Sequence, residues 1–219
     1  MPRTSKDGPS LREQRRRQHQ ELSRTQILDG AEEVFARKGF HDATIKEIAT
    51  LAEYSVGAVY SFFENKDDLF VQIYLRRGGE FMEGMRSLLA VARKPMEQLL
   101  ELADFQIGFF REHANFGRLF LRASGVTLGD LESKIDHVVA DNYDEAMALQ
   151  AKLFREGQES AEIRDGDINV LAAMFSGLVS AYQSTDPAVV GNGAVGDEAM
   201  SLDEFHEILD GAFGKARRR

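Results

Sequence analysis

Residues 44–70 read TIKEIATLAEYSVGAVYSFFENKDDLF, and this stretch holds the starts of three helices within very little chain. Thr44, followed three residues later by Glu47, forms a capping box in which each side chain accepts the backbone N–H of the other residue. A helix is therefore predicted to begin at Ile45. Its apolar residues recur at helical spacing and give it one buried face: Ile45, Ile48, Ala49 and Ala52.

Ser55 is the next candidate N-cap, so residues 53–54 remain as the connection and a short helix is predicted from Val56 to about Phe63. The outward residues of this helix are small and let its backbone approach another surface closely: Val56, Gly57, Ala58 and Ser61. Asn65, three residues before Asp68, predicts the cap of a third helix. Two helices joined by a tight turn, with a third behind them, are the layout of a DNA-reading helix-turn-helix.

A supporting helix precedes this stretch. Apolar spacing predicts that it runs from about Arg24 to Gly39, and glycine at the end suits a C-terminal cap. The first three helices are expected to fold around a small core made of Phe35, Phe40, Ile45, Ile48 and Val59. Because so small a bundle is marginal alone, we expect the helix that starts at Lys66 to stabilise it.

Residues Thr25 to Tyr74 resemble the DNA-binding domain of the tetracycline-repressor (TetR) family of bacterial regulators. The resemblance rests on four motifs, which are ILDGAEEVFARKGFHDAT at 27–44, IKEIATLA at 45–52, SVGAVYSFF at 55–63 and NKDDLF at 65–70. In one departure, the family often has glycine where this chain has Glu53.

The resemblance implies two sets of DNA contacts. One set is expected to bind phosphates and set the register on the duplex: Thr44, Lys46, Ser55, Tyr60 and Lys66. The other set is expected to face the bases: Tyr54, Val56, Gly57, Ala58 and Ser61. An alternative stays open for Tyr60, whose ring would then serve the small core while only its hydroxyl reaches DNA.

The net charge of −9 would by itself argue against a nucleic-acid partner, but the charge is unevenly distributed. Residues 1–66 carry 11 Lys and Arg against 10 Asp and Glu, whereas residues 67–219 carry 16 against 26. The acidic residues therefore lie away from the predicted DNA-binding surface. The chain has no cysteine, no apolar run long enough to span a bilayer and no signal peptide, so the sequence predicts a cytoplasmic protein without membrane contact.

Four segments are predicted along the chain. Residues 1–22 form a basic, disordered arm that either contacts DNA or stays a solvated tail, and residues 23–70 form the DNA-binding domain. Residues 71–214 form a helical regulatory and dimerisation domain, and residues 215–219 form a basic tail. No segment alternates at period two, so the predicted fold is all-α, with an N-terminal three-helix helix-turn-helix domain and a C-terminal helical domain.

Within the C-terminal domain, long helices are predicted over residues 66–89, 131–156 and 168–183. Further helices are expected to start at Pro95 and, after a capping box, at Leu202, whereas residues 187–196 are predicted as a loop. Three glycines interrupt the helix over 66–89, and they either permit close packing or soften it: Gly78, Gly79 and Gly84.

The resemblance also implies dimerisation through the last two long helices and a ligand cavity among the central ones. The apolar candidates for lining it are Phe81, Met85, Phe105, Phe109, Phe120, Met147, Phe154, Met174 and Phe175. Plain core packing is the competing interpretation for each of them. The polar candidates are Gln106, His113, Asn142, Tyr143, Gln150 and Gln183.

Catalytic and metal-binding motifs are missing from the sequence. The five histidines are scattered, and there is no HExxH, phosphate-binding loop or GxSxG motif, so the chain is predicted not to be an enzyme and to need no cofactor or metal. We expect a homodimeric transcriptional repressor that binds a near-palindromic operator of double-stranded DNA and is released by a small, largely apolar effector. The alternative is a ligand-independent DNA-binding or partner-recruiting helical protein that uses the same domain as a tether.

Overall fold

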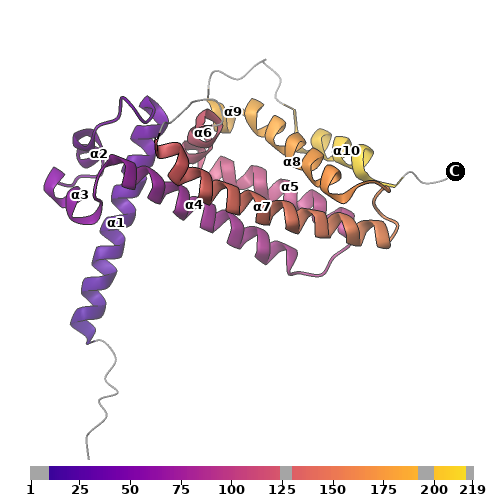
Figure 1. Cartoon of the computed structure of the whole chain (residues 1–219), viewed down its shortest axis with the longest axis horizontal. Helices are drawn as coiled ribbons and strands as arrows, with labels where there is room; N and C mark the ends of the chain where they lie inside the picture. Colours follow the sequence, from indigo (N-terminus) through magenta and orange to yellow (C-terminus); the bar gives the residue numbers. More distant parts are fainter. Residues whose placement is uncertain (1–9, 124–129, 192–199, 216–219) are drawn as a thin grey trace, which may run out of the picture. The chain divides into compact units, whose positions relative to one another are not determined.

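The computed structural model describes residues 10–123, 130–191 and 200–215 (Figure 1). Within these ranges the fold is all-α, as predicted, and the one β feature is an isolated bridge between Ile163 and Gly214. In chain order the helices are α1 (Leu11–Lys38), α2 (Ile45–Leu51), α3 (Val56–Phe62), α4 (Lys66–Leu89), α5 (Pro95–Glu112), α6 (Ala114–Ala123), α7 (Asp130–Glu159), α8 (Ile168–Thr185), α9 (Pro187–Val190) and α10 (Leu202–Phe213).

The chain divides into two compact units, and the boundary lies inside α4, after Ile73. None of the helices in the described ranges combines the length and the apolar content that a membrane span requires.

Helix α1 begins much closer to the N-terminus than the expected start near Arg24. Ser10 and Glu13 form a capping box, in which the Ser10 N–H donates to Glu13 Oε2 at 2.8 Å and the Glu13 N–H donates to Ser10 Oγ at 3.3 Å. Residues 11–22 are therefore helical and exposed along their whole length, and the prediction of a disordered arm is wrong for them. Arginine, glutamine and glutamate are good helix formers, which explains why a polar segment extends the helix. Residues 1–9 lie outside the described residues.

The helix starts in residues 44–66 lie where the capping residues predicted them. Thr44 and Glu47 form the expected capping box at the start of α2, and Ser55 Oγ accepts the N–H of Ala58 at 3.0 Å at the start of α3. Asn65 caps α4, because its side-chain oxygen Oδ1 accepts the backbone N–H of Asp68 at 2.8 Å. Short local hydrogen bonds thus set the positions of all three helices.

The aromatic core of the first unit joins α1 to α4. The Phe70 ring of α4 lies edge-on to Phe35 at 5.1 Å and to Phe40 at 5.0 Å between centroids. Ile48 of α2 and Val59 of α3 are fully buried. The fourth helix therefore completes this core, as expected for a bundle that is too small to be stable alone.

The turn between α2 and α3 places Glu53 at a φ of 61°, in the left-handed region. A side chain with a Cβ is strained there, and glycine is not. The observed backbone therefore gives a physical reason for the glycine that TetR-like sequences often carry at this position.

Replacing Glu53 with glycine is expected to raise the free energy of unfolding by about 1 kcal/mol, because relief of left-handed strain exceeds the added chain entropy. Urea titration followed by circular dichroism measures the change. The Glu53→Gln variant is the control, since it removes the charge but keeps the strain. Equal stabilisation by glutamine would show that charge, and not backbone strain, is responsible.

The second unit contains α7 and α8 as an antiparallel pair packed side by side (Figure 1). Its core holds three aromatic rings, where Phe154 lies 5.2 Å from Phe213 and 6.4 Å from Phe175. Residues 187–190 form the short helix α9, so the prediction of a loop over 187–196 is wrong for them. Asp186 caps it through a bond of 3.0 Å from the N–H of Ala188, with proline in the first turn, a start signal that is visible in the sequence.

Two of the three glycines in α4 lie at close helix contacts. A Cβ added at Gly84 would lie 2.4 Å from the Phe105 ring, and one added at Gly78 would lie 2.5 Å from Asn142 Nδ2. Gly79 has no such neighbour within 4 Å. Close packing is therefore the role of Gly78 and Gly84.

Candidate DNA-binding surface and ligand cavity

The outward edge of α3 is exposed and low in bulk. Val56 is 40% exposed and Tyr60 is 54% exposed. A Cβ added at Gly57 would meet only Ser55 Oγ, at 3.9 Å. Because the Tyr60 ring lies in solvent, the alternative in which it serves the small core is wrong.

The inner side of α3 is held by apolar residues and by one arginine. Val59 and Phe63 are buried. Arg24 of α1 lies over the Phe63 ring at 4.6 Å and donates to the Phe62 carbonyl at 3.4 Å and to Gln72 Oε1 at 2.6 Å. The sequence pattern predicts Arg24 only as the approximate start of the supporting helix, since no local pattern shows a contact across so long a sequence separation.

Lys66 contacts backbone carbonyls of its own chain, whereas the resemblance predicts a phosphate contact for it. Its ammonium donates to the carbonyls of Phe40, His41 and Ala43 at 2.8, 3.1 and 3.0 Å, and it lies 4.5 Å from the centre of the Phe40 ring. An ammonium has three N–H donors, and all three are used here. In this structure Lys66 therefore clamps the connection between α1 and α2, and no donor remains for a phosphate.

Several hydroxyls assigned to DNA already donate within the protein. Thr44 donates to Glu47 Oε2 at 2.9 Å, Tyr54 donates to Gln26 Oε1 at 2.7 Å, and Ser61 donates to a carbonyl of its own helix at 2.6 Å. An ionised phosphate only accepts hydrogen bonds, so the Thr44 hydroxyl would have to give up its bond to the Glu47 carboxylate in order to donate to one. Tyr54 and Ser61 can still accept a bond from a base amino group, and their assignment to the bases stays a prediction.

Lys46 is the exposed lysine of α2. The neighbouring Lys38 is bound to the Glu47 carboxylate, and the bonds from Lys38 and Thr44 lower the pKa of that carboxyl. The Glu47 carboxylate is stabilised in the folded state. Its contribution to stability is therefore fully present above the pKa of Glu47 in the unfolded chain, and it is lost as the pH falls through the lower pKa of the folded state. This surface therefore keeps its charge pattern at neutral pH.

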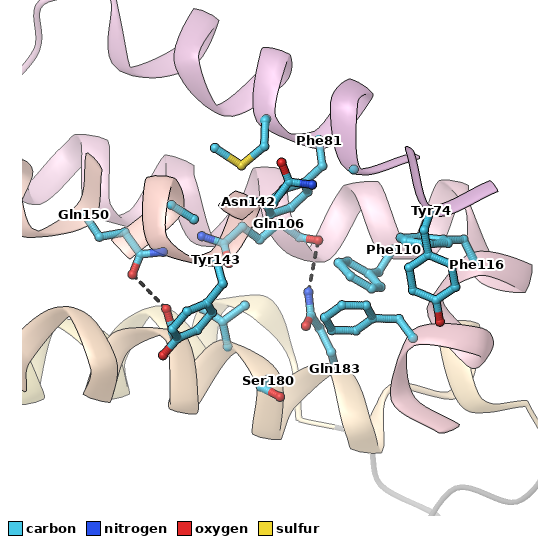
Figure 2. Close-up of a pocket in the computed structure, with 16 residues that line it drawn as sticks. Tyr74, Phe81, Gln106, Phe110, Phe116, Asn142, Tyr143, Gln150, Ser180 and Gln183 are labelled. Carbon is cyan, nitrogen blue, oxygen red and sulfur yellow. Dashed lines mark hydrogen bonds between the residues drawn. The ribbon is translucent and has the colours of Figure 1, made fainter. Parts of the chain in front are cut away.

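The second unit contains a cavity of about 240 Å³ (Figure 2). Figure 2 shows Tyr74, Phe110 and Phe116 at one end of it and Tyr143 and Gln150 at the other. The lining residues come from α4, α5, α6, α7 and α8, and they are Tyr74, Gly78, Phe81, Met82, Gln106, Phe110, Phe116, Phe120, Asn142, Tyr143, Ala146, Gln150, Ser176, Val179, Ser180 and Gln183. None of these described residues is charged.

Two of the apolar candidates, Phe81 and Phe120, line this cavity. The others do not: Met85, Phe105, Phe109, Met147, Phe154, Met174 and Phe175. Phe154 and Phe175 are fully buried in the core, and Met174 is 51% exposed. Helical periodicity shows which residues face inward, but it does not show which of them border an unfilled space.

The polar candidates were more informative than the apolar ones. Five of the six border the cavity: Gln106, Asn142, Tyr143, Gln150 and Gln183. The exception is His113, whose ring packs edge-on against Phe109 at 4.6 Å. Polar residues on these helices were therefore the better sequence signal for the cavity.

Helix α3 follows α2 after a tight turn, and its first residues are small and exposed. This arrangement defines the first unit as a helix-turn-helix DNA-binding domain. Residues 27–73 match the family described as "Bacterial regulatory proteins, tetR family". The first unit is therefore a DNA-binding domain of this family, and the chain is similar to transcriptional regulators that carry such a domain.

Known proteins resemble the chain well beyond this domain. It is 26% identical over 164 residues to the fatty acid metabolism regulator protein of Bacillus subtilis, covering 73% of this chain and 81% of that protein. It is 27% identical over 171 residues to the HTH-type transcriptional repressor NicS of Pseudomonas putida, covering 77% and 79%. The crystal structure of FadR from Bacillus subtilis in complex with stearoyl-CoA has a TM-score of 0.69 at 24% identity, covering 84% of this chain and 96% of that chain.

Proposed function

We propose that the chain is a homodimeric repressor that binds a near-palindromic operator through α3 of each subunit and is released by a small molecule bound in the cavity. The exposed edge of α3 supports the proposed binding to DNA, and the cavity supports the proposed binding of an effector. NicS is named a repressor, and FadR is named in a complex with stearoyl-CoA, which supports both parts by similarity.

Helix α4 is the element through which a ligand would change DNA binding. Its Phe70 belongs to the aromatic core behind the helix-turn-helix, and its Phe81 lines the cavity. A ligand that prefers a different tilt of α4 would move the paired α3 helices out of register with successive major grooves. A coupling of about 1–3 kcal/mol would weaken DNA binding about 5- to 150-fold.

The exposed start of α1 would add electrostatic attraction to this surface. Four arginines lie on exposed turns of the helix: Arg12, Arg15, Arg16 and Arg17. Contacts of this kind bind phosphates without reading sequence, and their contribution falls steeply with salt.

The dimer would form through an exposed apolar stripe on α8. Val170 is 56% exposed and Met174 is 51% exposed, and the stripe consists of Val170, Ala173, Met174, Gly177 and Ala181. A Cβ added at Gly177 would have no neighbour within 4 Å in the chain itself. Small residues on one helical face allow close approach of a second helix, and α10 presents the exposed Ile208 for the same contact.

Replacing Gly177 with arginine is expected to convert the dimer to a monomer and to weaken operator binding at least about tenfold, because only a dimer contacts two half-sites. Sedimentation velocity measures the oligomeric state, and Gly79→Arg, at an exposed position of α4, is the matched control. A Gly177→Arg protein with the same mass in solution as the parent would contradict the proposed interface.

The proposal as a whole is tested by recovering bound fragments from a pool of genomic DNA. Two inverted half-sites about one helical turn apart are expected, near 34 Å. Small molecules released from the purified protein are then identified by mass spectrometry and added back to the DNA complex. DNA binding that no metabolite alters would instead favour a ligand-independent or partner-recruiting protein.

A further inference from the structure

One hydrogen-bond donor in the cavity has no partner among the described residues. Gln106 is only 7% exposed, and its side-chain nitrogen Nε2 is buried without an acceptor. Two other polar side chains of the lining donate within the protein: Gln183 Nε2 donates to the Gln106 backbone carbonyl at 3.1 Å, and Ser176 donates to Gln150 at 2.8 Å (Figure 2). A buried donor left unpaired is unfavourable, so an acceptor on a ligand would be favoured at this point.

The rest of the described lining disfavours a charged ligand. Its walls are mainly apolar and carry no basic or acidic side chain, and they include four phenylalanines: Phe81, Phe110, Phe116 and Phe120. An ion buried among such groups loses its hydration without gaining a counter-charge. The cavity of about 240 Å³ is also smaller than the ~300–1,000 Å³ of sites for drug-sized molecules, so its ligand is small.

We propose that the cavity selects a small uncharged molecule whose carbonyl, ether or hydroxyl oxygen accepts a hydrogen bond from Gln106 Nε2. This inference rests on the proposed function, because it names the chemical class of the effector for the same cavity. The stearoyl-CoA named in the FadR structure is larger and charged, so the ligand proposed here belongs to a different chemical class. Gln106 thereby favours ligands that have a hydrogen-bond acceptor over ligands that lack one.

Four planar molecules of nearly equal shape separate charge from hydrogen bonding: acetophenone, α-methylstyrene, benzoate and benzamidine. Each is titrated into the full-length protein without DNA by isothermal titration calorimetry at neutral pH. Acetophenone is expected to bind, α-methylstyrene to bind about tenfold more weakly because it lacks the acceptor, and the two ions to bind at least about tenfold more weakly than acetophenone.

The Gln106→Leu variant is expected to bind acetophenone and α-methylstyrene equally, within about twofold, since the donor is gone. Gln150→Leu is the control, because Gln150 lines the same cavity but already bonds Ser176, and it should keep the tenfold preference. Retained binding of α-methylstyrene shows that the cavity of either variant is intact. Benzoate or benzamidine binding as tightly as acetophenone, no binding of acetophenone, or an unchanged preference in Gln106→Leu would each overturn the proposal.

The readout does not involve DNA. A protein that binds acetophenone as expected but no operator would defeat the proposed repressor and leave the ligand class standing. The reverse result would defeat the ligand class alone.

Discussion

Replacing Gly57 with leucine is expected to weaken operator binding at least about 100-fold, equivalent to about 2.7 kcal/mol, while the protein stays folded. Gly57 lies on the exposed edge of α3, and a Cβ there meets no part of the chain closer than 3.9 Å. The leucine side chain therefore fits the free protein, but it occupies the space that a base pair would need. Leucine is also the better helix former, by roughly 0.8 kcal/mol, so the fold gains slightly.

The matched control is Gly79→Leu, which places the same side chain at an exposed position of α4 with no neighbour within 4 Å. This variant is expected to gain similar helix stability and to keep its operator affinity. Affinities are measured by fluorescence anisotropy with a labelled operator at one salt concentration, and thermal unfolding is followed in parallel. Operator affinity that survives the Gly57 change would show that α3 does not read the major groove in the proposed way.

Replacing Lys66 with methionine is expected to lower the free energy of unfolding by about 2–3 kcal/mol. The substitution keeps the apolar stem but removes the three hydrogen bonds from the ammonium to the connection between α1 and α2. The carbonyl of buried Ala43 would then lose its charged donor. Urea titration followed by circular dichroism measures the loss.

The salt dependence of DNA binding distinguishes a clamp from a phosphate ligand. If Lys66 acts as the clamp seen here, Lys66→Met leaves the slope of log affinity against log salt unchanged once the folded fraction is taken into account. Lys46→Met is the matched comparison, because exposed Lys46 is a predicted phosphate ligand. It is expected to reduce the slope by about 1.8, which is about 0.9 for each subunit of the dimer, and to leave stability within about 0.5 kcal/mol. A reduced slope for Lys66→Met would restore the phosphate role.

Local hydrogen bonding explains why most helix starts could be predicted. A capping pair acts within three residues, so Thr44 with Glu47 and Ser201 with Glu204 indicate helix starts before any tertiary contact forms. Ser10 and Glu13 have the same capping-box spacing, but the basic composition of residues 1–22 favours the prediction of disorder. The error lay in weighing composition above a specific local pattern.

Side-chain partners far apart in sequence could not be predicted in the same way. The Lys66 ammonium contacts carbonyls more than twenty residues earlier, and the Arg24 guanidinium contacts Phe62 and Gln72 far along the chain. A helical pattern shows which face is buried, but it does not show which atoms that face meets. The cavity is a similar case, since Phe81 borders it while Phe154 does not.

The sequence by itself determined the order of the helices, the capped turn before α3 and the small residues on its outward edge, because these features depend on interactions within a few residues. Only the tertiary structure decided that Lys66 clamps a loop, that Glu53 occupies a left-handed turn and that Gln106 keeps a free donor beside a cavity. The physical reason is that packing brings distant groups together, and the pairing of each buried polar atom depends on all of its neighbours at once.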